Sequence, residues 1–503
     1  MWFGLERIIE ALVFLGTSIL VARSLGAEKL GYLMFLNFVL GVANQVSGLG
    51  LAAATKKYMA EYFGKGRPEV AAAVYRYTLR LQVLLAAFIA TGGCAITFSL
   101  GNPAYRGAAY ILSVAAIPAL LTWIPSQANT ASEDFSRNVP SSVIATAVYA
   151  LVIVLAVIFR LGLAGVASAT LASRSVELVV RIFPVYKRLA SFPAAPIPQE
   201  LKRQIRRFCT QTLGLTVLAL VVWDRSEVLF LKAFCDLRQL AYYSVGFSLA
   251  QRMLILPFVF GGATSASLMV ESARDETRID SIFRNAITYL AFFALPAYLG
   301  MAAIAGPLIR LAYGDLYVAA VPVLIISVLL ATIRGVQPLA EALFQAIDRQ
   351  DVVLRWMFVV GIVNIALDAA LIPHFQAIGA ALGNGIAQVL GVLGLWVAVV
   401  RLLHLHTPLI KLGRIAFSAL VMMTAVIAAT HSLQPFYAIC TAIPLGLLIY
   451  SFLLRATAAV DPDDARRIQQ LTAILPQSLR RRADALLSWI GNCNKLRQAA
   501  NQA

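Results

Sequence analysis

The sequence predicts an all-helical membrane protein that crosses the bilayer many times, and three observations lead to that prediction. Hydrophobic residues make up 60% of the 503 residues and charged residues only 13%, with a mean hydropathy of +0.78. Soluble domains carry roughly a quarter charged residues, so the composition excludes a soluble enzyme. Apolar runs of about 20 residues, long enough to cross a bilayer as helices, recur along the chain. The net charge of +17 then indicates basic cytoplasmic loops rather than nucleic-acid binding.

The apolar runs predict fourteen membrane spans, six of them before a polar, basic segment and eight after it. Each run holds few charged residues and is bounded by polar or basic turns. The expected spans are 8–25, 30–54, 79–100, 108–128, 141–160, 165–186, 211–233, 240–270, 287–309, 318–346, 356–373, 378–400, 414–431 and 436–455.

The order of the spans predicts two six-helix lobes followed by two further helices. The first lobe is expected at 1–186 and the second at 211–400, joined by a basic cytoplasmic linker at 187–210. Residues 401–455 hold the last two spans, and 456–503 form a cytoplasmic amphipathic tail. The first span directly follows the N-terminus without a small-residue cleavage pattern, so we expect it to remain as a membrane anchor.

The two lobes carry a similar short segment near the start of their second span. Leu30–Tyr32 reads Leu-Gly-Tyr and Leu240–Tyr242 reads Leu-Ala-Tyr, each after a short polar turn. Parallel repeats of this kind are typical of transporters, which often bind substrate between them. The alternative is that any two hairpins of a polytopic protein look alike.

The distribution of basic residues predicts the orientation of the chain in its membrane. Most of the 42 lysines and arginines fall in alternate loops and the tail, which places both termini in the cytoplasm. The tail combines an apolar stripe with Arg480–Arg482 and Trp489. A helix of this kind lies on an anionic membrane surface or docks on the protein's own loops, and the sequence leaves both alternatives open.

A small set of charged residues lies inside the expected spans. Charges at mid-bilayer cost a few kcal/mol or more and therefore face the protein interior or a water-filled cavity. Arg181 is expected near the cytoplasmic surface, where its long side chain can reach the headgroups. The arginines expected to bind substrate are Arg23, Arg174, Arg225, Arg252 and Arg334.

Acidic and polar residues accompany these arginines. Arg174, Glu177 and Arg181 share one helical face, because residues three and four apart are neighbours. They could equally be an ion cluster that holds helices together. Asp224 and Glu341 are the candidates for coupling to an ion gradient. Several guanidinium groups in one cavity suit an anionic substrate, since they pair with phosphate through two hydrogen bonds. Amide side chains in the spans, such as Asn37, Gln127 and Gln251, could bind sugar hydroxyls or bond across helices.

The sequence indicates neither an enzyme nor a cofactor or metal site. The five cysteines are far apart without paired spacing, and His404 and His406 lack a metal-site context. A Walker A motif is absent, which argues against ATP hydrolysis by this chain.

Several short segments follow the motifs of one known family. Ala22–Tyr32 reads ARSLGAEKLGY, and Asp224-Arg225 is followed by Ala241–Ser244, which reads AYYS. The other matching segments are Gly48–Leu51, Lys56–Tyr58, Leu163–Ala167 and Ile378–Ala381. Together they resemble the polysaccharide transporter branch of the multidrug/oligosaccharidyl-lipid/polysaccharide (MOP) superfamily, which includes Wzx-type O-antigen flippases and is related to lipid II flippases and MATE exporters. Ala22–Tyr32 resembles the segment after the first helix of these flippases, and Asp224-Arg225 with Ala241–Ser244 resembles their helix 7 and the start of helix 8, although Ala241 stands where glycine is common.

The resemblance implies a fourteen-helix, two-lobed protein of the bacterial inner membrane that moves a polyprenyl-pyrophosphate-linked oligosaccharide by alternating access. It implies a cationic lumen, and the motifs match at Arg23 and Arg225 but not at Arg252 or Arg334. Helices 13 and 14 would form a groove for the lipid tail. The partners would be the lipid-linked oligosaccharide, membrane lipids, a proton or sodium ion, and polysaccharide polymerase or glycosyltransferases.

Two other functions remain open at this point. One is a cation-coupled multidrug or small-molecule antiporter of the same superfamily. The other is a scaffold that does not transport and supports an envelope polysaccharide synthase.

Overall fold

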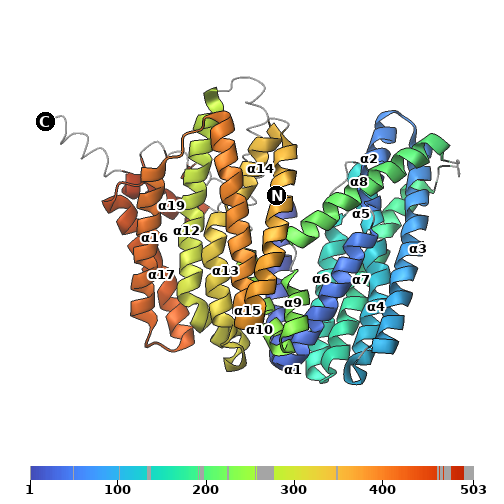
Figure 1. Ribbon diagram of the computed structural model, residues 1–503, viewed down its shortest axis with the longest axis horizontal. Helices are drawn as coiled ribbons and strands as arrows, with labels where there is room; N and C mark the ends of the chain where they lie inside the picture. Colours follow the sequence, from blue (N-terminus) through green and yellow to red (C-terminus); the bar gives the residue numbers. More distant parts are fainter. Residues whose placement is uncertain are drawn as a thin grey trace. The chain divides into compact units, whose positions relative to one another are not determined.

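The computed structural model shows an all-helical protein (Figure 1). Its helices form two compact units: Met1–Lys232 with Asp236–Ala241, and Ala233–Cys235 with Tyr242–Ala503. The structure describes residues 2–48, 50–100, 102–132, 138–190, 192, 197–223, 226–254, 257, 277–346, 349–461, 464, 468–469 and 477–491.

The described part of the first unit is built of helices that pack side by side. α7 packs along both α4 and α6, and α3 packs along α4, as Figure 1 shows. The helices are α1 (Trp2–Ser47), α2 (Leu51–Gly64), α3 (Pro68–Leu100), α4 (Arg106–Leu121), α5 (Trp123–Ala131), α6 (Asn138–Ile158), α7 (Gly162–Leu189), α8 (Gln199–Trp223) and α9 (Glu227–Phe234).

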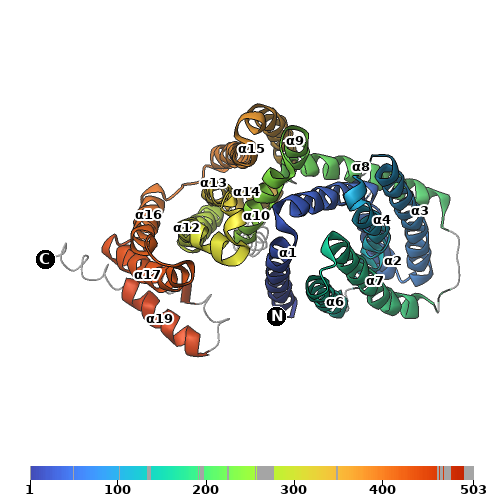
Figure 2. The same ribbon diagram turned by 90° about the horizontal axis from the view of Figure 1, so that it is seen from below.

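In the second unit a long central helix, α12, contacts α13, α16 and α17. The tail helix α19 lies against α17 (Figure 2). The helices that follow α9 are α10 (Leu237–Met253), whose first residues belong to the first unit, α12 (Thr277–Tyr313), α13 (Ala320–Arg334), α14 (Gln337–Ala346), α15 (Gln350–Leu403), α16 (Leu409–Thr430), α17 (Pro435–Ala456) and α19 (Gln477–Gly491).

Ten helical segments among the described residues are long and apolar enough to cross a membrane. Two of them each contain two expected spans: Glu10–Gly64 covers the first pair, and Gln350–Leu403 covers 356–373 and 378–400. The ten segments therefore account for twelve expected spans. The expected spans 211–233 and 240–270 lie partly outside the described residues.

In both double-length segments a residue with a left-handed backbone lies between the two expected spans. Gly26 has φ 73° and ψ 171° within α1, a conformation that glycine adopts without a Cβ penalty. Gln376 has φ 52° within α15, which is unusual for a residue with a side chain. After this bend, Gly379 approaches the Leu371 carbonyl so closely that a Cβ would lie 2.4 Å from its oxygen. Small residues thus let the two halves of α15 pack against each other.

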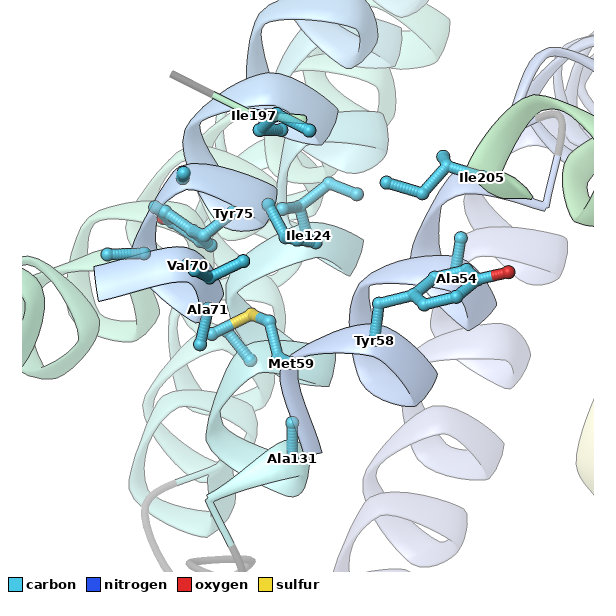
Figure 3. Close-up of a cluster of buried hydrophobic side chains, with 14 of the residues drawn as sticks. Ala54, Tyr58, Met59, Val70, Ala71, Tyr75, Ile124, Ala131, Ile197 and Ile205 are labelled. Atoms are coloured by element: carbon cyan, nitrogen blue, oxygen red, sulfur yellow. The ribbon is translucent and has the colours of Figure 1, made fainter. Parts of the chain in front are cut away.

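The segment expected as a linker contributes to the core of the first unit. α7 continues to Leu189, and α8 begins at Gln199 and packs on α1 and α2. Ile197 and Ile205 are buried beside Tyr58, Met59 and other residues of α2, α3 and α5 (Figure 3). Burial also raises the pKa of the Cys209 thiol to about 11, so this residue is a neutral core side chain. The amphipathic start of α8 therefore fixes α8 to the first unit.

We expect Gly31→Ala to destabilise the first unit, because a Cβ at Gly31 would lie 1.8 Å from the backbone oxygen of Leu237. The backbone cannot move aside as a flexible side chain can. The substitution should therefore lower the free energy of unfolding by about 1–3 kcal/mol or more. The measurement is the thermal unfolding midpoint of the purified full chain in detergent. The control is Gly16→Ala, also in α1, where a Cβ meets nothing within 4 Å. Equal midpoints for the two variants would contradict the close approach.

Candidate functional site

A polar cavity lies in the first unit between α1, α4, α5, α6 and α7. It consists of two adjoining hollows with volumes of about 450 Å³ and about 750 Å³. Amide, hydroxyl and charged side chains line both hollows. Such polar groups are uncommon inside a membrane domain, where charged residues are costly. The residues shared by both linings are Asn37, Ser126, Gln127, Thr170, Arg174, Glu177 and Arg181.

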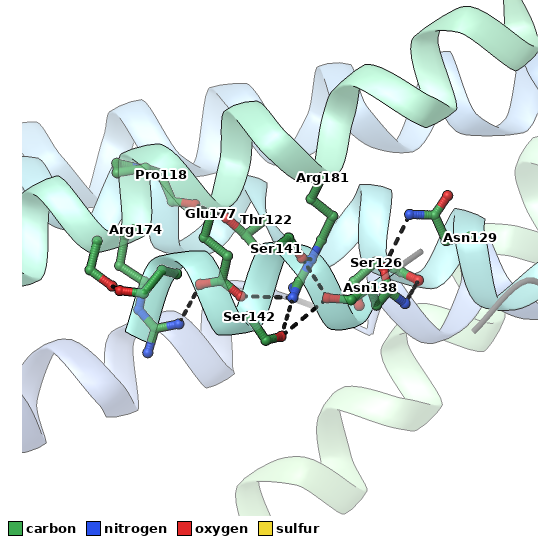
Figure 4. A network of polar contacts seen from close by, with 12 residues as sticks. Pro118, Thr122, Ser126, Asn129, Asn138, Ser141, Ser142, Arg174, Glu177 and Arg181 are labelled. Atoms are coloured by element: carbon green, nitrogen blue, oxygen red, sulfur yellow. Dashed lines mark hydrogen bonds and ion pairs between the residues drawn. The ribbon is translucent and has the colours of Figure 1, made fainter. Parts of the chain in front are cut away.

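An ion cluster of Arg174, Glu177 and Arg181 on α7 lines this cavity, and Figure 4 shows how the three side chains lie. The Glu177 carboxylate lies between two guanidinium groups: its Oε2 is 2.7 Å from Arg174 Nη1 and its Oε1 is 2.9 Å from Arg181 Nη2. The spacing of three and four residues along the helix brings these groups to the same face. The sequence predicted this cluster, and the structure confirms it.

The two arginines of the cluster differ in environment. The Arg181 side chain is 9% exposed, whereas that of Arg174 is 47% exposed. Arg181 also donates from Nε to Ser141 Oγ at 2.9 Å and from Nη2 to Ser142 Oγ at 3.0 Å. Both serines belong to α6. Arg181 therefore ties α7 to α6, while the Arg174 guanidinium keeps donors directed toward the cavity.

Positive charge is in slight excess around the larger hollow. Among its described lining residues, Lys56, Arg174 and Arg181 stand against Glu10 and Glu177. Because Glu177 is shared between two arginines, the cluster as a whole carries one positive charge. An anion is therefore a better match for this cavity than a cation.

Amide side chains brace the end of the cavity where α5 meets α6. Asn138 donates from Nδ2 to the Ser126 backbone oxygen at 3.1 Å, and Asn129 donates to Asn138 Oδ1 at 3.1 Å. Asn129 is almost fully buried. A buried amide with satisfied hydrogen bonds fixes the position of its neighbours, here Ser126, which lines both hollows.

In the second unit, Arg334 lies at the end of α13 and is buried. Its Nη1 donates to Gln251 Oε1 at 2.7 Å, beside a small cavity of about 20 Å³ that Asn384 and Gln388 also line. The cavity is close to the size of one or two water molecules. Arg334 is thus held within a polar network of the second unit.

The other described residues that the sequence predicts for the site do not line the polar cavity of the first unit. Arg252 is half-buried in the last turn of α10, next to Gln251. Glu341 in α14 accepts a hydrogen bond from Gln337 Nε2 at 2.7 Å. Arg23 is exposed on α1 and does not line either hollow as the described residues define them. Asp224 and Arg225 lie outside the described residues.

The structure places Arg181 differently from the expectation and adds Ser141 and Ser142, the two serines that bind it. The expectation that Arg181 reaches the membrane surface is wrong, because the side chain is buried among α6 and α7 groups. Asp368 in α15 is 0% exposed, and Asn364 Nδ2 lies 3.5 Å from its Oδ2. Asp368 lies inside the expected span 356–373, four residues after Asn364 and therefore on the same helical face.

An apolar pocket of about 540 Å³ lies in the second unit against α12, α16, α17 and α19. Phe292, Met422 and Tyr450 line it from the spans, and Leu486 and Ile490 line it from α19. The tail helix is docked on the protein, as one of the two alternatives for the tail proposed. Arg455 of α17 donates to the Trp489 backbone oxygen at 2.7 Å, and its guanidinium carbon lies 4.4 Å from the centre of the indole ring.

The fold resembles solved transporter structures over most of its length. A lipid II flippase MurJ in an inward closed conformation aligns with a TM-score of 0.72 and 17% identity, covering 90% of this chain and 97% of that one. An inward-facing multidrug resistance MATE family transporter of the MOP superfamily aligns with a TM-score of 0.61 and 18% identity, covering 78% of this chain and 95% of that one. A MOP superfamily transporter from Pyrococcus furiosus aligns with a TM-score of 0.55 and 15% identity, covering 80% of this chain and 94% of that one. The chain is therefore a multi-pass membrane protein with the MurJ/MATE fold.

Residues 20–322 match the family described as "Polysaccharide biosynthesis protein". The chain belongs to this family. No curated protein sequence matches it. Family and fold together place the chain among MOP-superfamily transporters of polysaccharide biosynthesis rather than among enzymes.

We expect Glu177→Ala to lower stability far more than Arg174→Ala. Removing the carboxylate leaves the buried Arg181 guanidinium without its counter-charge, which costs about 3–5 kcal/mol. Removing the half-exposed Arg174 leaves the Glu177–Arg181 pair intact and should cost no more than about 1 kcal/mol. Thermal unfolding of both purified variants in detergent measures the difference. Similar losses in the two variants would show that Arg181 does not depend on Glu177.

Proposed function

We propose that this protein flips a polyprenyl-pyrophosphate-linked oligosaccharide, the repeat unit of a polysaccharide, across the bacterial inner membrane by alternating access. The observation that carries the proposal is the cationic ion cluster of α7 on the wall of a cavity of about 750 Å³. Membership of a polysaccharide biosynthesis family supports a sugar-containing substrate. The similarity to MurJ supports a lipid carrier for that sugar.

The pyrophosphate is the group that Arg174 is suited to bind. A guanidinium forms two parallel hydrogen bonds with a phosphate oxygen pair, and Arg174 uses only one of its terminal nitrogens on Glu177 in the described contacts. Glu177 orients this arginine without cancelling the charge of the cluster, because it is shared with Arg181. The cluster would bind the pyrophosphate with one excess positive charge rather than several. The substrate can therefore dissociate again on the opposite side of the membrane.

The sugar requires hydroxyl-binding groups along the path. Asn37, Gln127, Thr170 and Tyr149 line the hollows near Arg174 and offer both donors and acceptors. These groups are spread over α1, α5, α6 and α7. A lining of neutral amides and hydroxyls binds sugars weakly at each contact, which suits a substrate that must move through.

The polyprenyl tail would remain in an apolar environment throughout transport. The pocket of about 540 Å³ on α16 and α17 is lined almost entirely by apolar side chains. We place the lipid tail there, because α16 and α17 are the last two spans, which the resemblance assigns to a lipid groove. Van der Waals packing against these side chains would hold the isoprenoid chain in place, because lipid chains and apolar side chains are equally apolar. The lipid moiety therefore supplies affinity while the arginines supply recognition.

The finer parts of the proposal concern coupling and location. A proton or sodium gradient would drive transport, with Asp224 and Glu341 as the coupling carboxylates. Both termini would lie in the cytoplasm, with the lobes at 1–186 and 211–400, a linker at 187–210, the last two spans at 401–455 and the tail at 456–503. Arg23, Arg225, Arg252 and Arg334 would contribute to the cationic path, and a polymerase and glycosyltransferases would act on the same substrate.

We expect Arg174→Ala to reduce surface polysaccharide by roughly tenfold or more, because one charge-assisted pair to phosphate contributes about 1.5–3 kcal/mol. Arg334→Ala should also reduce surface polysaccharide, because it removes the hydrogen bond from Arg334 to Gln251 in the polar network of the second unit. Complementation of a strain that lacks the gene, followed by quantification of cell-surface polysaccharide, measures the effect at matched protein levels.

The matched control is Arg349→Ala, which removes an exposed arginine paired with Asp351 outside any cavity described above. It should leave polysaccharide output unchanged. Arg174→Lys separates charge from geometry and should restore part of the output. Normal output in both Arg174→Ala and Arg334→Ala cells would overturn the assignment, and efflux of cationic drugs without any change in polysaccharide would favour the antiporter.

A further inference from the structure

A second, separate hollow lies on the surface of the first unit, between α3 and α8. It has a volume of about 1130 Å³. None of its described lining residues is shared with the polar cavity around Arg174. It lies where the basic start of α8 meets the middle of α3.

One wall of this hollow is apolar and open to the surroundings. It is formed by Leu81, Leu84 and Leu85 of α3. The Leu84 side chain is 68% exposed, and Phe88, one turn further along α3, is 75% exposed. In a membrane protein such a surface faces lipid chains rather than water. The floor is sealed by the buried residues Leu51 and Ile205.

The facing rim is strongly basic. Arg203, Arg206 and Arg207 are exposed and line the hollow from α8. Their spacing of three and four residues places them on one face of the helix. The opposite face of α8 is packed into the core through Leu201 and Ile205, so the arginines cannot rotate inward.

Positive charge is in excess on this rim among the described residues. Glu200 is the one acidic side chain among the described lining residues. In the described part of the chain, none of the three arginines has an acidic group within ion-pair distance. The rim therefore carries two net positive charges beside an apolar wall.

We propose that this hollow binds one anionic phospholipid of the surrounding bilayer. The phosphodiester would pair with the Arg203, Arg206 and Arg207 guanidinium groups, and the acyl chains would lie along Leu81, Leu84 and Leu85. Charge complementarity selects the anionic headgroup. The leucine wall distinguishes a lipid from a soluble anion, because only a lipid removes that apolar surface from water. The site goes beyond the proposed transport function and does not depend on it.

Binding at this place would fix α8 against α3. α8 is the element that leads out of the first six-helix block toward α9 and α10. An anionic lipid that bridges α3 and α8 would therefore stabilise the first unit in bilayers that contain such lipids. The expected gain is in stability and lipid selectivity.

The test uses the purified full chain in detergent, titrated with phosphatidylglycerol or with phosphatidylcholine of the same acyl chains. The unfolding midpoint should rise at a concentration of phosphatidylglycerol at least tenfold lower than that of phosphatidylcholine, since each basic residue at a membrane surface contributes about fivefold in affinity. The triple variant Arg203→Gln/Arg206→Gln/Arg207→Gln should lose this preference. The matched control Arg480→Gln/Arg481→Gln/Arg482→Gln removes three charges from α19 and should keep it.

Two further arms separate the headgroup, the chains and the fold. Leu84→Asn should weaken both lipids severalfold and keep the preference, because the exposed leucine contacts chains and not headgroups. Glycerol 3-phosphate should not raise the midpoint, and a rise equal to that with phosphatidylglycerol would overturn the lipid assignment. A wild-type protein that does not distinguish the lipids, or a triple variant that still does, would also overturn it. If the triple variant is less stable without lipid, Arg206→Gln alone gives the comparison, with an expected loss of about fivefold.

Discussion

The carboxylate of Glu177 between two guanidinium groups is the interaction on which the polar cavity of the first unit depends. An isolated charge inside a membrane domain is costly, so it persists only with partners and hydrogen bonds around it. Glu177 allows Arg181 to be buried against Ser141 and Ser142. It also holds Arg174 at the cavity wall with its charge preserved. Stability and recognition thus use the same three residues: all three line the cavity, and Arg174 is the more exposed of the two arginines.

Helix α8 likewise has one face that packs into the protein and one face that exposes charge. Its apolar face enters the core cluster of the first unit, while its arginines stay outside. In the tail, α19 places Leu486, Leu487 and Ile490 over the apolar pocket and Trp489 beside Arg455. Amphipathic helices at the ends of the spans therefore cover apolar surface that the spans alone leave open, while their polar faces carry charge.

The sequence predicted the fold class and twelve of the spans because a spanning helix has a nearly fixed apolar length. It did not show that two pairs of spans continue into each other through Gly26 and Gln376, since a single bent residue leaves no mark in hydropathy. It found the Arg174–Glu177–Arg181 cluster because helical spacing is local. It misplaced Arg181 because the serines that bury it lie on another helix, about 40 residues earlier in the chain.

The most direct test of the central claim is transport by the full chain reconstituted in proteoliposomes with a polyprenyl-pyrophosphate-linked oligosaccharide. The substrate is incorporated only in the inner leaflet, and its arrival in the outer leaflet is followed with a membrane-impermeant sugar-binding protein. A flippase predicts that the sugar becomes accessible with the wild-type protein, and much more slowly with Arg174→Ala at equal reconstitution. Accessibility no greater than in protein-free liposomes, in the presence of either a proton or a sodium gradient, would contradict the account.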